Sequence, residues 1–122
     1  MRSIWTEDQP IYRQLKDKMV AAIVDGGLAE GEALPSVRSV AVDLQINPVT
    51  ASKAYQELVA DGLVEIRRGL GMFLLVGARD KALAAERARF SDEQWPQILT
   101  TIRRLGFDAN ELLAREFGKK GK

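Results

Sequence analysis

The chain has 122 residues, of which 46% are hydrophobic and 29% are charged, as is typical of one folded domain or of a small domain with an appendage. It contains no cysteine and no histidine, which excludes disulfides and thiolate chemistry and removes the commonest general base and metal ligand. The net charge is +1, with eight basic and ten acidic residues over positions 1–77, so bulk electrostatics does not by itself indicate a nucleic-acid partner.

An amphipathic helix is predicted over residues 10–25, PIYRQLKDKMVAAIVD. Pro10 suits the first turn, where its missing N–H costs nothing, and Gly26 and Gly27 favour a left-handed stop. Residues 28–35, LAEGEALP, are predicted to form a connector. The apolar stripe of this helix consists of Ile11, Leu15, Val20, Ile23 and Val24, with Met19 beside it.

A second, shorter helix is predicted to begin after Ser36, which is a good N-cap. Its sequence VRSVAVDL places four apolar residues towards a core. Two residues later come Asn47, a preferred N-cap, and Pro48, a preferred first residue of a helix. The third helix is expected to continue to about Asp61 and to stop at Gly62. Two short helices joined by so tight a turn indicate a helix-turn-helix.

A β-hairpin is predicted directly after the third helix. Residues 63–66, LVEI, alternate between apolar and polar, and residues 72–76, MFLLV, are rich in strand formers. Between them, RRGLG supplies a basic loop with two glycines. The order helix, helix-turn-helix, hairpin is that of a winged helix, so the expected fold class is mainly α with a small β-hairpin. We assign residues 9–77 to this domain.

The composition changes at residue 78, where alanine and charged residues predict another helix over residues 78–90. Ser91 and Gln94 fit a capping box for the following helix. Pro96 lies close behind and could instead mark the first turn of that helix.

The remaining residues predict two more helices, one ending at Gly106 and a short one over residues 108–117. Residues 118–122 are expected to form a flexible tail. The helical region 78–117 is too short for an independent core. Some of its apolar side chains can pack on the first domain, and the remainder are expected to pack against the same region of a second copy of the chain. The candidate dimerisation residues are Leu83, Phe90, Trp95, Ile98, Leu99, Ile102, Leu105, Leu112 and Leu113.

No pattern typical of an enzyme is found. The chain has no P-loop, no GxGxxG fingerprint and no paired carboxylates, and the single G-x-G at Gly69 and Gly71 is too short to indicate a nucleotide. We therefore expect no catalytic residue, cofactor or metal. Since no apolar run reaches the ~20 residues of a membrane helix and the N-terminus lacks a signal-peptide pattern, we expect a cytoplasmic protein without membrane contact.

Residues 9–77 resemble the winged-helix domain of the GntR family of bacterial transcriptional regulators, on the segments PIYRQLKDKMVAAI, LPSVRSVA and INPVTASKAYQELVADGLVEIRRGLGMFL. The NP-x-T-x-x-K-A-Y-x-E-L pattern and the short helical region that follows are similar to the YtrA subfamily. Two positions depart from the family pattern. Val37 replaces a frequent glutamate, which would remove an ion pair, and Val49 stands where relatives often have asparagine.

The resemblance implies a regulator that binds double-stranded DNA. It places Arg38 near the DNA backbone or a base edge, the start of the third helix in the major groove, and the wing near the minor groove. The candidate DNA-contacting residues are Ser36, Arg38, Asn47, Val49, Thr50, Ser52, Lys53, Arg67, Arg68, Gly69 and Gly71.

The chemistry of the third helix agrees with this role. A helix entering the ~12 Å major groove needs a slim face with donors and a methyl-sized apolar group. Thr50 and Ser52 can hydrogen-bond phosphates or base edges, Lys53 can reach a guanine or a phosphate, and Val49 can contact a thymine methyl group. The alternative is that these are simply exposed residues on a solvated helix.

The other candidates also have structural alternatives. Arg38 could pair with Asp43 of its own helix. Adjacent strand residues point to opposite faces, so only one of the two wing arginines is expected to face DNA, and we favour Arg68 over Arg67. The two wing glycines could serve only to turn the chain.

We therefore expect a homodimeric, sequence-specific DNA-binding regulator that recognises two half-sites about one helical turn apart. The resemblance further implies a repressor, and it leaves open an unidentified small-molecule effector that acts through the C-terminal helices. The competing hypothesis is a winged helix used as a protein-interaction or adaptor module without a DNA function.

Overall fold

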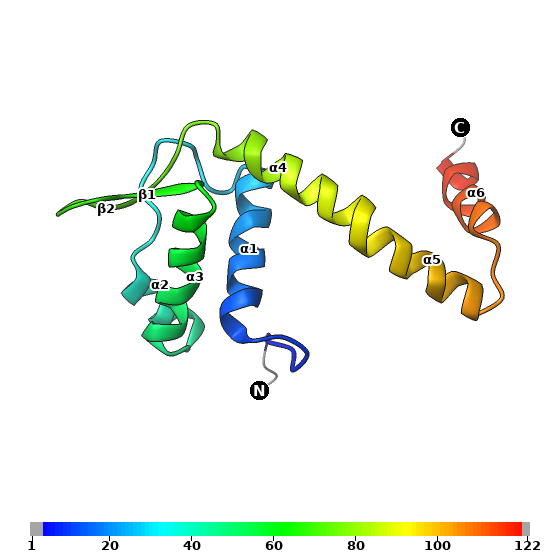
Figure 1. Ribbon diagram of the computed structural model, residues 1–122, viewed down its shortest axis with the longest axis horizontal. Coiled ribbons are helices and arrows are strands. Elements are labelled where there is room, and N and C mark those ends of the chain that lie inside the picture. The colour runs from blue at the N-terminus through cyan, green and yellow to red at the C-terminus, as the bar shows by residue number, and fades with distance from the viewer. Residues whose placement is uncertain (1–3, 121–122) are drawn as a thin grey trace. The chain divides into compact units, whose positions relative to one another are not determined.

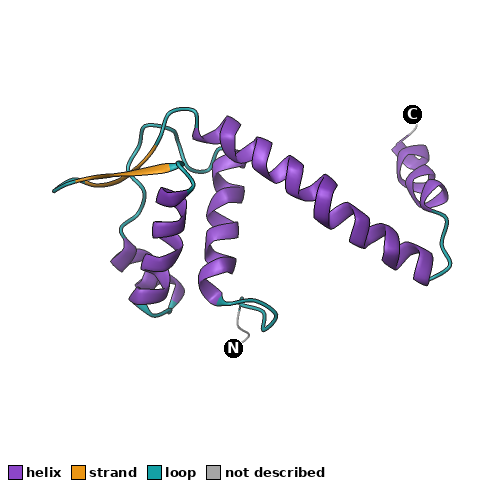
Figure 2. Ribbon diagram, viewed as in Figure 1, coloured by secondary structure: helices purple, strands orange, loops and turns teal. Residues whose placement is uncertain are grey.

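The computed structural model describes residues 4–120 and divides into two compact units, one up to Leu83 and the other from Ala84 onward. The chain is mainly helical with one antiparallel hairpin, which confirms the predicted fold class (Figures 1 and 2). The elements are α1 (Ile11–Asp25), α2 (Val37–Leu44), α3 (Pro48–Ala60), β1 (Val64–Arg67), β2 (Gly71–Leu74), α4 (Ala78–Arg89), the π-helical turn η1 (Phe90–Gln94), α5 (Trp95–Arg104) and α6 (Ala109–Lys120).

Helix α1 has nearly the predicted bounds. Pro10 lies outside the helix as its N-cap, and its carbonyl accepts hydrogen bonds from the backbone N–H groups of Arg13 and Gln14. At the other end, Gly26 adopts a left-handed conformation with φ 88° and closes the helix. This conformation has no steric cost for glycine, which explains the stop at the predicted position.

The helix-turn-helix is formed by α2 and α3, as predicted. Ser36 caps α2, because its Oγ accepts a hydrogen bond of 3.0 Å from the backbone N–H of Ser39. The turn starts at Gln45, whose φ of 57° is the one positive value at a non-glycine residue in the described part of the chain. The N–H of Ile46 then reaches back to the carbonyl of Ala41 at 3.0 Å, which ties the turn to α2.

The strands of the hairpin differ slightly from the predicted ranges, since β1 has the predicted length but begins one residue later, and β2 begins one residue earlier and ends two residues earlier. The last pair of the hairpin, next to the turn, is formed by Arg67 and Gly71. The sequence did not predict that β2 also pairs on its other edge. There the connector that precedes α2 contributes a bridge between Ala33 and Phe73 and a hydrogen bond of 2.8 Å from the N–H of Leu34 to the carbonyl of Met72. This pairing holds the base of the wing against the helices, because the connector is itself anchored by the buried side chain of Leu34.

One hydrophobic core unites α1, α3, the hairpin and the start of α4. Tyr55 and Leu58 of α3 are fully buried, and Ile23 of α1 is 1% exposed. The phenol of Tyr55 donates a hydrogen bond of 2.5 Å to the carbonyl of Pro35, so its polar atom is satisfied inside the core. The other buried core residues are Leu15, Met19, Val20, Leu34, Ala41, Ala51, Ala54, Leu63, Val64, Leu74, Ala78 and Ala82.

The second unit contains the latter part of α4 together with η1, α5 and α6. The predicted capping box at Ser91 is wrong. The helix continues as a π-helical turn through this position, and the Ser91 hydroxyl donates to the carbonyl of Arg87 at 3.1 Å instead of capping a new helix. Instead of a break between two helices, the helical backbone widens locally into this π-helical turn. Pro96 lies in the first turn of α5.

Helix α6 is capped by Asp108, whose Oδ1 accepts a hydrogen bond of 2.8 Å from the N–H of Asn110. It extends to Lys120, so residues 118–120 of the predicted tail belong to a helix. Residues 121–122 lie outside the described residues.

Candidate DNA-binding surface

Helix α3 is fixed at its N-terminus by Asn47 and Pro48. The Asn47 Oδ1 accepts a hydrogen bond of 2.8 Å from the N–H of Val49, and Pro48 occupies the first turn without needing a hydrogen-bond partner for its nitrogen. The buried side of the helix carries two alanines besides Tyr55 and Leu58, and this lets α3 lie close against its neighbours. The direction of the helix is therefore set by its core face and its cap.

The opposite side of α3 forms a slim, exposed face. Val49 is 75% exposed, and Lys53 and Gln56 are exposed as well. Thr50 and Ser52 are half-buried. The Gln56 amide donates to the Ser52 hydroxyl at 3.3 Å, so this hydroxyl keeps its own proton for an external acceptor.

Lys53 also makes a contact that sequence reasoning missed. Its ammonium lies 4.1 Å from the centroid of the Tyr12 ring on α1, within the range of a cation–π interaction. A tyrosine beside the apolar stripe of an N-terminal helix carries no sequence signal for such a pairing. The contact arises only from the tertiary fold, because Tyr12 and Lys53 are 41 positions apart in the sequence.

The start of α2 carries Arg38. Its side chain is exposed and makes no ion pair with Asp43, or with any other acid in the part of the chain described here. The structural alternative of a pairing inside α2 therefore has no support. Val37, which stands where the family often has a glutamate, is half-buried and packs against the core. The position is thus used for apolar packing in this chain.

The wing is a tight turn between β1 and β2. Gly69 and Gly71 have φ of 78° and 120°, and the N–H of Leu70 bonds to the carbonyl of Arg67 at 2.9 Å. Both glycines are therefore needed for the turn, and space remains around each of them. Leu70 is 72% exposed at the tip.

The two wing arginines differ in their surroundings. Arg67 pairs with Glu65 and lies 4.2 Å from the centroid of the Phe73 ring. Arg68 is exposed and has no ion pair or hydrogen bond within residues 4–118. Of the two, Arg68 is the side chain that is available to a phosphate.

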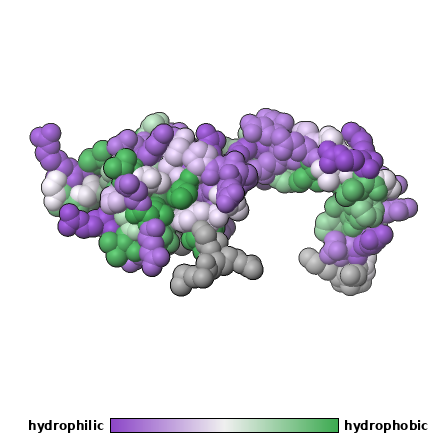
Figure 3. Space-filling model, turned by 90° about the horizontal axis from the view of Figure 1, so that it is seen from below, coloured by the Kyte–Doolittle hydropathy of each residue, from purple (hydrophilic) through white to green (hydrophobic). Residues whose placement is uncertain are grey.

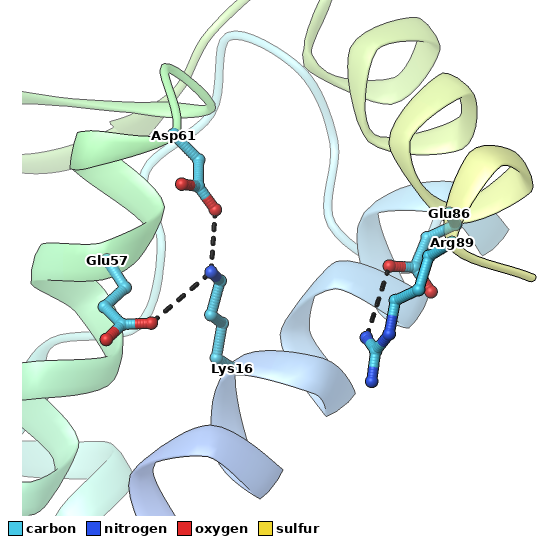
Figure 4. A network of polar contacts seen from close by, with 5 residues as sticks. All are labelled: Lys16, Glu57, Asp61, Glu86 and Arg89. Carbon is cyan, nitrogen blue, oxygen red and sulfur yellow. Dashed lines mark hydrogen bonds and ion pairs between the residues drawn. The ribbon is translucent and has the colours of Figure 1, made fainter. Parts of the chain in front are cut away.

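An ion-pair network joins α1 to α3 and to the residue that follows α3 (Figure 4). Lys16 Nζ lies 2.7 Å from Asp61 Oδ2 and 3.4 Å from Glu57 Oε1. Burial lowers the pKa of Lys16, but the hydrogen bonds and attraction from Asp61 and Glu57 outweigh this effect and leave the pKa above its ordinary value. The network fixes the α3 helix against α1 one turn beyond the contact between Lys53 and Tyr12.

The candidate DNA-contacting residues all belong to the first unit, and Ser36 and Asn47 already serve there as helix caps. Leu83, predicted to take part in dimerisation, also belongs to the first unit and is half-buried. The other candidate dimerisation residues lie in the second unit.

The second unit exposes much of its apolar surface (Figure 3, green). Trp95 stacks on Phe90 with 6.4 Å between ring centroids, while Phe90 remains 48% exposed. None of its described apolar side chains is buried. The exposed large apolar residues of this unit are Phe90, Ile98, Leu105, Phe107, Leu113 and Phe117.

The described residues lack the features of two other protein classes. No described helix has the length and apolar character required to cross a bilayer. Within residues 4–118, no three carboxylates, cysteines or histidines gather into a possible metal site.

Comparison with known proteins places these observations in a family. Residues 11–74 match the family described as "Bacterial regulatory proteins, gntR family". The chain is 36% identical over 93 residues to the transcriptional regulator YhcF of Bacillus subtilis, which covers 76% of this chain and 69% of YhcF. It is 33% identical over 103 residues to the transcriptional repressor YtrA of the same organism, which covers 84% of this chain and 78% of YtrA.

One solved structure is similar to this chain over nearly its whole length. A GntR family transcriptional regulator from Listeria monocytogenes superimposes with a TM-score of 0.76 at 25% sequence identity, and the match covers 97% of this chain and 100% of that one. The family match and the fold thus agree, and the chain belongs to the GntR family of bacterial transcriptional regulators, with a DNA-binding helix-turn-helix in its first unit.

Proposed function

We propose that this regulator is a cytoplasmic repressor that binds a pseudo-palindromic operator as a homodimer. The observation that carries the proposal is the exposed face of α3, where Val49, Lys53 and Gln56 project from a helix whose opposite side is fully buried. This face is narrow enough for the major groove and offers both donors and one methyl-sized apolar contact. YtrA of Bacillus subtilis is described as a repressor, which supports repression as the outcome of binding.

The readout at α3 is divided among different kinds of contact. Ser52 keeps a free hydroxyl proton for a phosphate or a base acceptor, and Lys53 brings a positive charge. Val49 has no hydrogen-bonding side chain, so its contribution is contact with a thymine methyl group. A protein with these side chains on its recognition helix is expected to prefer a thymine at the base pair facing Val49.

Phosphate contacts come from Arg38 and Arg68. Neither is engaged by a described acid, so each can approach the DNA backbone without breaking an interaction inside the protein. The first unit is net acidic, and binding therefore depends on local neutralisation at these side chains and Lys53. Two copies would supply about six cationic contacts, which gives a steep dependence on salt concentration.

Dimerisation is assigned to α5 and α6. Leu105 is 63% exposed and Phe117 is 66% exposed, and both belong to a unit without a buried core. A second copy of the same unit would cover these side chains with an equally apolar surface. The two recognition helices would then reach successive major grooves about 34 Å apart.

The test is selection of bound fragments from a random-sequence DNA library with the wild type, an Arg38→Ala/Lys53→Ala variant and a Lys81→Ala/Arg87→Ala control. The control removes two exposed charges from α4, outside both the proposed DNA surface and the helices assigned to dimerisation. We expect the wild type and the control to recover the same inverted repeat and the first variant to recover none.

Recovery of the same repeat by all three proteins would contradict the roles of Arg38 and Lys53. Recovery of no motif by the wild type, even at low salt, would contradict operator binding. It would favour a protein partner for the exposed Val42 and Val49, which are 69% and 75% exposed.

A further inference from the structure

The contact between Lys53 and Tyr12 links the recognition helix to a helix outside the helix-turn-helix. The Lys53 ammonium lies 4.1 Å from the Tyr12 ring centroid. This is a short distance for a cation–π contact, which remains attractive to about 6 Å. A lysine on an exposed helix face would otherwise sample many rotamers around its four-carbon side chain.

The ring is a fixed partner. Tyr12 is half-buried and packs against the hydrophobic core. One turn further along α1, Lys16 pairs with Glu57 of α3 and with Asp61 at the end of that helix, so the two helices cannot slide past each other without breaking these ion pairs. The Tyr12 ring therefore keeps its place relative to the Lys53 backbone.

The contact with Tyr12 leaves the Lys53 ammonium able to bind other groups. Lys53 has no ion pair among the described acids, and its side chain is exposed. A ring face satisfies one side of an ammonium electrostatically and leaves its N–H groups free for a phosphate or a guanine. The contact thus restricts the lysine without neutralising it.

We infer that Tyr12 is a positioning residue for DNA recognition, which holds the Lys53 side chain in the conformation that meets the operator. The inference rests on the proposed role of Lys53 in DNA binding. A lysine that is already ordered loses less conformational freedom when it contacts DNA, so the free energy of binding is more favourable. Tyr12 contributes to affinity in this way without touching the operator itself.

A double-mutant cycle tests the inference. Tyr12→Leu keeps apolar packing but removes the aromatic face, and Tyr12→Phe keeps the face but removes the hydroxyl. Each is combined with Lys53 and with Lys53→Ala, and the Kd for a fluorescein-labelled duplex carrying the selected repeat is measured by anisotropy. Thermal melting of every variant checks that it is folded.

We expect Tyr12→Leu to weaken binding about two- to five-fold when Lys53 is present, since an exposed cation–π contact is of this magnitude. In the Lys53→Ala background the same change should leave Kd unaltered. Tyr12→Phe should restore the affinity lost in Tyr12→Leu. An equal loss in both backgrounds would overturn the inference, because Tyr12 would then act without Lys53, and tighter binding of Tyr12→Leu would overturn it too.

The failure of the proposed function has a different signature. If Lys53→Ala binds the duplex as tightly as the wild type, Lys53 makes no contact with DNA and the underlying proposal fails. A second measurement covers the case in which Tyr12→Leu does not fold. In the wild type, the ring current of Tyr12 should move the NMR resonances of the Lys53 ε-methylene protons upfield, and ordinary random-coil positions would overturn the inference without any variant.

Discussion

Arg67 and Glu65, two residues apart on β1, are joined by an ion pair in which Arg67 Nη2 lies 2.8 Å from Glu65 Oε2. They can meet because alternate residues of a strand share one face. The guanidinium also lies over the Phe73 ring of β2, so it connects the two arms of the hairpin. The neighbouring Arg68 begins the turn and has no such partner within residues 4–118.

The two wing arginines should therefore respond differently to alanine substitution. Arg68→Ala is expected to weaken operator binding and to lower the slope of log Kd against log salt by about one unit, as for a lost phosphate contact. Arg67→Ala should mainly lower the free energy of unfolding, by about 0.5–1 kcal/mol, because its contacts are within the hairpin and partly exposed. Salt-dependent anisotropy and chemical denaturation separate the two effects. Equal salt slopes in the two variants would contradict the assignment.

The Lys16 network should contribute to stability in a pH-dependent manner. Because the ion pairs raise the pKa of Lys16 in the folded state, its contribution is fully present below the ordinary lysine pKa and is lost as pH rises through the raised value. Lys16→Met should lower the free energy of unfolding at neutral pH by about 1 kcal/mol. The difference from the wild type should vanish at strongly alkaline pH.

The matched control for Lys16→Met is Lys81→Met. Lys81 is exposed on α4 and makes no ion pair with the described acids. Its replacement should leave the unfolding curve within a few tenths of a kcal/mol of the wild type. A comparable loss in both variants would show that general charge, not the network, accounts for the effect.

The phenol of Tyr55 should ionise at a higher pH than an ordinary tyrosine. Burial raises the pKa of its phenol to about 12, against an ordinary value of about 10. The fold therefore favours the protonated phenol, and this contribution to stability is complete below about pH 10 and is lost as pH rises towards 12. In a Tyr12→Phe variant Tyr55 is the one remaining tyrosine of the two in the sequence. Its ionisation, followed by tyrosinate absorbance, should have a midpoint near 12, and a midpoint near 10 with native circular dichroism would refute this.

The turn of the helix-turn-helix offers a stabilising substitution. Gln45 adopts φ 57°, a left-handed conformation that costs a residue with a side chain roughly 1 kcal/mol relative to glycine. Gln45→Gly should therefore raise the free energy of unfolding by up to ~1 kcal/mol, less the greater entropy of glycine in the unfolded chain. Gln45→Ala is the control, since it removes the same side chain but keeps the Cβ atom and the strain. A gain in the alanine variant as large as that in the glycine variant would rule out backbone strain as the cause.

The elements of the winged helix could be predicted because their ends are marked locally. Ser36 and Asn47 are caps whose hydrogen bonds involve residues only two or three positions away, and Gly26 supplies a left-handed stop. Signals of this kind act over one helical turn, so a single sequence contains them in full. The exposed face of α3 followed from the same helical periodicity.

Other features depend on residues far apart in the chain. The pairing of Ala33 with β2 and the contact of Tyr12 with Lys53 each bring together segments about 40 residues apart. No local pattern predicts them, because their partners are chosen by the packing of the whole unit. The capping box at Ser91 failed for a related reason. The motif is present in the sequence, but no new helix begins at Ser91. The helix continues through this position as a π-helical turn.

The first turns of α4 have a consequence for how this domain can be combined with others. Ala78 and Ala82 are 1% and 2% exposed, and Arg79 donates to the Val24 carbonyl and through its backbone N–H to Glu30, both at 2.8 Å. A gene fusion joined at Gly77 would thus remove two alanines from the core and leave the carbonyl at the end of α1 without its donor. The transferable module is the winged helix together with the beginning of the helix that leaves it, and a new C-terminal domain must be joined within an α-helix, in the correct helical phase.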